Sequence, residues 1–88
     1  MEILKVSSKS SPNSIAGAIA GMVKDNKEVS MQAVGAGAIN QAVKAVAIAR
    51  GFTTPTGVDL SLSPSFTEVN INGDDKTGLR FTIETKSI

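Results

Sequence analysis

The chain has 88 residues, of which 41% are hydrophobic, and nine basic against eight acidic side chains leave a formal charge of +1. This length predicts one domain over residues 1–88, and the near-neutral balance argues against a protein that relies on strong electrostatic attraction to nucleic acid. Cysteine and histidine are both absent, which excludes disulfides, thiolate zinc sites and the usual general base near neutral pH.

The chain begins with a short strand and a serine-rich segment. Residues 2–7 alternate and are partly apolar on both faces, as in a strand inside a sheet. The N-terminus shows no signal-peptide pattern, and no apolar run reaches the roughly 20 residues that span a bilayer, so we expect a cytoplasmic protein without membrane contact. Pro12, followed by Asn13 or Ser14 as the capping residue, predicts the start of a helix.

Residues 15–24 form the body of this predicted helix. One face carries apolar residues at helical spacing, namely Ile15, Ile19, Met22 and Val23. Gly17, Ala20 and Gly21 lie on the opposite face. Because a glycine inside a helix costs about 1 kcal/mol relative to alanine, we expect the close approach of another backbone to compensate.

A second strand, a turn and a second helix follow. Residues 28–34 alternate as a strand, two glycines turn the chain at 35–37, and a helix runs over 38–50 with Gly51 as its C-terminal signal. The predicted core stripe of this helix consists of Ile39, Ala42, Val43, Val46 and Ala47. Since Ile48 lies opposite Ile39, the helix is apolar on two sides, which predicts packing against the sheet on one side and a helix or second chain on the other.

Two further strands complete the chain. Residues 58–63 alternate, Pro64 interrupts the pattern and implies an edge position or a bulge, and residues 67–71 resume it. Asn-Gly at 72–73 predicts a hairpin turn into a strand over 79–84. The order is β-α-β-α-β-β, and right-handed crossovers place both helices on one face. The predicted fold is an α/β two-layer sandwich with a mixed four-stranded sheet.

The Gly-Ala-Gly turn at 35–37 matches a phosphate-binding loop only in part. The dinucleotide fingerprint needs a third glycine where position 40 is Asn, and no Gly-Lys-Ser/Thr follows, so a tight turn is the favoured interpretation. If the first two strands are parallel, however, this turn and the serine-rich loop share one sheet edge. Two helix N-termini there would offer free N–H groups and a partial positive charge to an anion.

Hydrogen-bond donors of the two loops and basic side chains of the second helix are the candidate contacts for such an anion. They are Lys9, Ser10, Ser11, Asn13, Gly35, Gly37, Lys44 and Arg50. Catalysis has little support, because the acidic residues are scattered and no histidine can activate a serine. We therefore expect no enzyme, no catalytic residue, no metal site, no cofactor and no small-molecule substrate.

The small and flat helix faces predict a contact surface. Its candidate residues are Gly17, Ala20, Gly21, Gln41, Ala45 and Ile48. They form either the contact between the two helices or an interface with a second copy. We expect a homo-dimer or tetramer, because a small domain with only three aromatic residues often needs association for stability.

Several segments closely resemble the stage V sporulation protein S family. They are Met-Glu-Ile-Leu-Lys-Val-Ser at 1–7, Lys-Ser-Ser-Pro-Asn-Ser at 9–14, Ala-Gly-Ala-Ile-Ala-Gly at 16–21, the long run 35–51, Gly-Val-Asp-Leu at 57–60 and Pro-x-Phe-Thr at 64–67. The resemblance implies a small cytoplasmic bacterial protein of endospore formation, at the coat-assembly and maturation stage. It also implies an Alba-like fold. Alba proteins bind DNA or RNA through the body of a dimer, with basic residues in the first strand-to-helix loop and in a hairpin. Lys9 lies in the corresponding loop of this chain.

Two departures weaken the nucleic-acid reading. The turn at 35–37 lacks the arginines common in Alba-type proteins, and the hairpin tip is acidic at Asp74 and Asp75. The leading hypothesis is a non-enzymatic sporulation regulator that oligomerises and binds DNA or RNA. The alternatives are a protein-interaction module of sporulation with no nucleic-acid role, and a protein that binds a small anionic metabolite at the two-loop edge.

Overall fold

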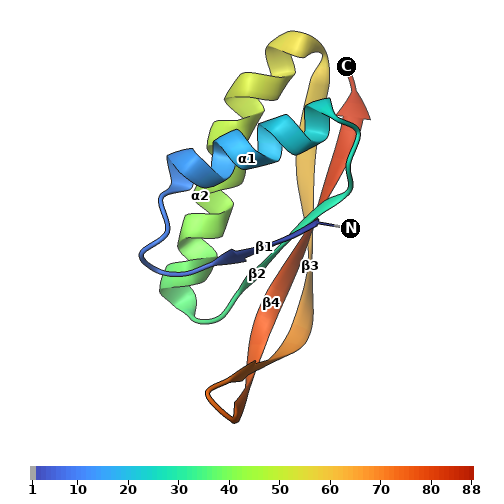
Figure 1. Ribbon diagram of the computed structural model, residues 1–88. Coiled ribbons are helices and arrows are strands. Elements are labelled where there is room, and N and C mark those ends of the chain that lie inside the picture. Colours follow the sequence, from blue (N-terminus) through green and yellow to red (C-terminus); the bar gives the residue numbers. More distant parts are fainter. Residues whose placement is uncertain (1) are drawn as a thin grey trace.

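The elements of the chain follow the predicted order in a computed structural model that describes residues 2–88 (Figure 1). In chain order they are β1 (Glu2–Val6), α1 (Pro12–Lys24), β2 (Val29–Ala33), α2 (Ala36–Thr53), the short 3-10 helix η1 (Thr54–Thr56), β3 (Val58–Ile71) and β4 (Asp74–Ser87). Both helices lie on one side of the sheet, and no helix of residues 2–88 lies on the other (Figure 1). The predicted two-layer α+β fold is confirmed.

The sheet is mixed, with strand order β1-β2-β4-β3. β1 and β2 run parallel, whereas β4 is antiparallel to both β2 and β3. β3 is an edge strand, which fits the prediction from Pro64, because a residue without an N–H is tolerated where one side of a strand has no partner. Pro64 does not interrupt the strand, however, and pairs with Phe81 of β4.

The hydrophobic core lies between the helices and one face of the sheet. Met31 of β2, at 0% exposed, pairs with Phe81 of β4, and alternate residues of both strands face the same way. Ile19 of α1 is fully buried against them, and the other apolar residues of its stripe are partly buried against the core. The predicted core face of α1 is therefore confirmed.

The helix ends differ from the sequence prediction. The N-cap of α1 is Ser11, whose hydroxyl accepts a hydrogen bond from the Ser14 N–H at 3.3 Å, and not Asn13 or Ser14. Pro12 then occupies the first helical position, where its missing N–H costs nothing. α2 continues through Gly51 to Thr53, and the left-handed residue that ends the following 3-10 turn is Gly57, with φ of +89°.

The core stripe of α2 is rotated relative to the prediction. Val43 is 46% exposed and Ala47 is exposed, whereas Ala45 and Ala49 are fully buried. The helix contacts both α1 and the sheet, so its alanine-rich side faces inward, where small side chains permit the closest approach. The buried side of the helix is therefore the one that carries Ala42, Ala45 and Ala49.

The β3–β4 hairpin is longer than the rest of the sheet. Each strand has 14 residues, but β2 pairs only with residues 79–83 of β4. The distal half of the hairpin therefore projects as two strands beyond the body, and it contributes to a longest dimension of 42 Å (Figure 1). Its turn is Asn72-Gly73, with φ of +51° and +86°.

Candidate functional site

The parallel pairing of β1 and β2 brings the two predicted loops together. The Cβ that an alanine would add at Gly37 would lie 2.9 Å from the Cβ of Ser8, so this glycine permits the contact between them. Gln41 of α2 donates a hydrogen bond from Nε2 to the carbonyl oxygen of Ser10 at 3.0 Å. The predicted shared edge of the sheet is therefore confirmed.

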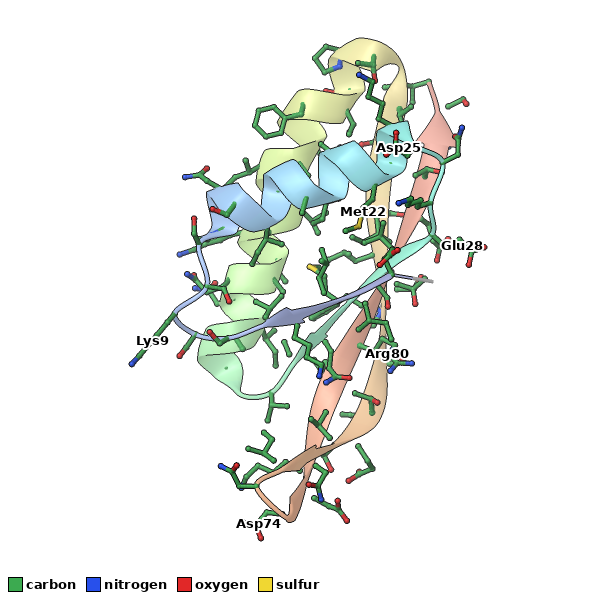
Figure 2. The ribbon with its side chains drawn as sticks, viewed as in Figure 1. Lys9, Met22, Asp25, Glu28, Asp74 and Arg80 are labelled. Atoms are coloured by element: carbon green, nitrogen blue, oxygen red, sulfur yellow. The ribbon has the colours of Figure 1, made fainter. Side chains whose placement is uncertain are left out.

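The β1–α1 loop is ordered by its own serines. The Ser7 N–H donates to Oγ of Ser10 at 2.9 Å, the Lys9 N–H donates to Oγ of Ser7 at 3.2 Å, and the Ser10 N–H donates to the Ser7 carbonyl at 3.1 Å. These bonds form a tight turn with Lys9 at its outer side. Figure 2 shows the Lys9 side chain pointing away from the body.

Both helices begin at this edge without an acidic residue in the first turn. Ser11 caps α1, whereas the N-cap of α2 is Gly35, with φ of +90° and no side-chain cap. Within residues 2–88 no side chain caps the first N–H groups of α2, and the dipole of this 18-residue helix adds partial positive charge. Asn13 is exposed in the first turn of α1.

The two basic residues of α2 that were predicted as contacts lie at different distances from this edge. Lys44 is exposed and lies about 12 Å along α2 from Ala36, one turn beyond Gln41. Arg50 lies about 21 Å along the same helix, near its C-terminal end. The structure therefore brings the serine loop and the glycine turn together, with Lys44 three residues beyond Gln41 on the same helix, but it does not bring Arg50 to them.

Arg50 instead pairs with Asp59 at the start of β3. Its Nε donates to Oδ1 at 2.7 Å and its Nη2 donates to Oδ2 at 3.3 Å, a two-pronged contact. The hydrogen bond from Arg50, together with one from the Leu60 N–H, lowers the pKa of the Asp59 carboxyl. The same hydrogen bond raises the pKa of Arg50 above its already high value.

The residues predicted for the contact surface divide into two groups. Ala45 is fully buried within this chain, and Gln41 is held by its bond to Ser10, so both belong to the monomer's own packing. Gly17 and Gly21 are exposed, and a Cβ at either position would meet no atom within 4 Å. The close backbone approach that would compensate for these glycines is thus not supplied by the described part of this chain.

The exposed group continues into a hydrophobic groove. Ala20 and Ile48 are half-buried. A groove of about 560 Å³ runs from Ala20 and Gly21 to Phe52, which is 56% exposed, and it is mostly apolar. At its side Thr53 is only 5% exposed, and its hydroxyl has no hydrogen-bond partner among residues 2–88. Sequence reasoning missed Phe52, because we ended the helix at Arg50.

Within residues 2–88, no group of three or more acidic side chains has the arrangement of a metal site. None of the helices in that range combines the length and apolar character needed to cross a membrane.

Two comparisons relate the chain to known proteins. Residues 2–86 match the model of the family described as "Stage V sporulation protein S (SpoVS)". The solved structure of Alba from Thermoplasma volcanium superposes with a TM-score of 0.63 over 99% of this chain and 100% of that one, at 18% sequence identity. The second comparison shows that the fold is Alba-like, and the first, which covers nearly every residue, shows that the chain belongs to the stage V sporulation protein S family.

Proposed function

We propose that the protein is a non-enzymatic regulator in stage V of sporulation that oligomerises and binds DNA or RNA at the edge formed by its two loops. Membership of the family supports the role in sporulation. The contact between the β1–α1 loop and the N-terminus of α2 is the observation that supports nucleic-acid binding, because it joins two segments rich in hydrogen-bond donors.

The contacts expected at this edge are charge-assisted and sequence-independent. Lys9 and Lys44 would pair with phosphates, and the free amides at the start of α2 would donate to phosphate oxygens. Ser10, Ser11 and Asn13 frame the same edge, although the Ser10 hydroxyl already accepts a bond within the loop and the Ser11 hydroxyl accepts one from the first turn of α1. Arg50 contributes less, because Asp59 already neutralises it.

A salt titration of binding tests the proposal. Binding of duplex DNA and of RNA would be measured against salt concentration for the wild type and for a protein carrying Lys9→Ala with Lys44→Ala. The variant should bind more weakly and show a shallower dependence on salt, by about 0.9 per lost phosphate contact on B-DNA. The proposal is wrong if the binding constant of the wild type does not depend on salt, or if the variant binds as tightly as the wild type.

The matched control is a double variant of two other lysines. Lys27 and Lys86 line one hollow near the C-terminal end of α1, at the opposite end of β2 from the two loops. Lys27→Ala with Lys86→Ala removes the same charge. If the control weakens binding as much as the test variant, the effect comes from net charge and not from this edge.

A protein-interaction module without nucleic-acid binding is the second candidate. Phe52 and Phe66 favour it, because they are 56% and 83% exposed in a chain with only three aromatic residues. Pull-down from sporulating cells with and without nuclease separates the two functions. Specific partners that survive nuclease, with no binding of purified nucleic acid, would support this candidate.

A further inference from the structure

The helix-free face of the sheet carries a polar row that the sequence analysis did not single out. Lys5 of β1 pairs in register with Gln32 of β2, Gln32 with Arg80 of β4, and Arg80 with Ser65 of β3. The alternate residues of β2 and β4 face the helices, so this row points the other way. Figure 2 shows Arg80 on the side of the sheet away from the helices.

Arg80 forms no ion pair with any acidic side chain of residues 2–88. No ion pair or hydrogen bond within residues 2–88 involves its guanidinium, and its Nε is buried without an acceptor. In the adjoining row Ser30, which pairs with Thr82, is 0% exposed, and its hydroxyl has no partner among residues 2–88. A partly buried cation without a partner is costly, and an anion on this face would offset that cost.

The surroundings of Arg80 are rich in donors and poor in acids. The adjoining row consists of Ile3, Ser30, Thr82 and Ser63, so neither row contains a carboxylate. Glu84, the next acidic position along β4 on this face, accepts a hydrogen bond from Ser63. Lys5 has no ion-pair partner within residues 2–88. The face therefore favours a negatively charged ligand.

The row is continuous with the two-loop edge. Lys5 lies two residues before the serine turn that presents Lys9, and a hollow of about 520 Å³ is lined by Lys5, Ser7, Ser8 and Gln32. Lys5 and Arg80 are two strands apart, or about 10 Å between Cα atoms, so their long side chains can reach the same or adjacent phosphates. Cations thus follow one another from the loop, around the β1 edge, onto the open face.

We propose that a single strand of nucleic acid continues from the two-loop edge around β1 and lays its phosphate backbone across the row of Lys5, Gln32 and Arg80. This inference rests on the proposed function. A single strand is chosen because a duplex is stiff over about 150 base pairs and cannot turn around the edge of so small a sheet. Phe81, the one aromatic residue of the central strands, faces the core, so binding is insensitive to base identity.

The experiment measures binding of labelled oligo-dT and oligo-U to the full chain against salt concentration. Arg80→Gln and Lys5→Gln should each reduce the magnitude of the log–log slope by about 0.7, the value for one phosphate contact on a single strand. Arg80→Lys should retain most of the slope. Lys27→Gln, which removes one charge at the far end of the sheet, should leave it unchanged. Lys5→Gln changes an exposed side chain, so it tests the proposal even if Arg80→Gln does not fold.

The outcomes separate the two proposals. If Lys9→Ala with Lys44→Ala weakens binding but Arg80→Gln and Lys5→Gln behave like Lys27→Gln, the nucleic-acid edge stands and the sheet-face path is wrong. If the two sheet-face variants weaken duplex and single strand equally, a path specific to single strands is wrong. If the wild type binds no nucleic acid at low salt, both proposals fail.

Discussion

Arg50 and Asp59 illustrate how the fold reassigns a residue. In the sequence Arg50 is one of the few bases on a helix of small residues, and a role in phosphate binding is a natural interpretation. In the structure Asp59, at the start of β3, lies beside Arg50, and the two side chains meet through two hydrogen bonds. The pair ties the end of α2 to the edge strand.

The titration of Asp59 gives the first prediction at the residue scale. Its folded pKa lies below the unfolded value, so its contribution to stability is present above about pH 4 and is lost as the pH falls through the folded value. Asp59→Asn should therefore lower the unfolding midpoint at neutral pH, and the difference from wild type should shrink toward acid pH. Urea unfolding at a series of pH values measures this difference.

Arg50→Gln provides the control for this prediction. The variant removes the hydrogen bond that is the main cause of the lowered pKa of Asp59. The pH-dependent part of the stability that is lost in Arg50→Gln should therefore fall in the same pH range as the part lost in Asp59→Asn. Because Arg50 is exposed, Asp59 is only half-buried and solvent screens the pair, the effect should be small and should diminish in high salt. Parallel profiles for wild type and Asp59→Asn would contradict the assignment.

At the scale of elements, the two helices use glycine for opposite purposes. Gly37 at the start of α2 allows the β1–α1 loop to approach, because a Cβ there would lie 2.9 Å from Ser8. Gly21 in α1 faces open space. The first glycine serves packing inside the chain, whereas the second leaves a flat surface that nothing in residues 2–88 covers.

Alanine at these two glycines should therefore change stability in opposite directions. Gly21→Ala should raise the free energy of unfolding by about 0.5–1 kcal/mol, since alanine loses less backbone entropy in a helix. Gly37→Ala should lower it, because the serine turn must move to make room. Urea unfolding at low protein concentration, where association is weakest, gives both values. Equal stabilisation by both variants would show that the loop yields at no cost.

The sequence alone predicted the order and type of the elements well, because strand alternation and helical spacing are local patterns. It was less successful where size or long-range pairing decides the outcome. The predicted core stripe of α2 included Val43 and Ala47 but not Ala45 and Ala49, although the latter two are fully buried. The row containing Arg80 depends on which strands are neighbours, and that information is absent from any single strand.

At the scale of the whole molecule, the exposed aromatic residues indicate association. Phe66 is 83% exposed in the middle of β3, and Phe52 is 56% exposed beside the flat face of α1. A chain this small buries a limited core. Covering these side chains with a second copy would stabilise the assembly by about 25 cal/mol for each Å² of apolar surface that is buried. These features support the proposed dimer or tetramer.

Sedimentation at tens of micromolar tests the oligomer and its interface. We expect a species larger than the monomer, and we expect Phe52→Ser to shift it toward the monomer, because Phe52 lies in the groove that continues the face of Gly21. Phe66→Ser is the matched control on β3. Dissociation by Phe66→Ser alone would move the interface to the edge strand, and a monomeric wild type would rule out both.

The edges of the sheet limit how copies can assemble. One edge is β1, with only 5 residues, and the other is β3, in which Pro64 has no N–H to donate to an incoming strand. Short edge strands and edge prolines both discourage the open-ended addition of strands that leads to fibres. We therefore expect copies of this protein to associate through contacts between side chains, which can form closed and finite assemblies. We do not expect them to associate by adding strands to the edge of the long hairpin.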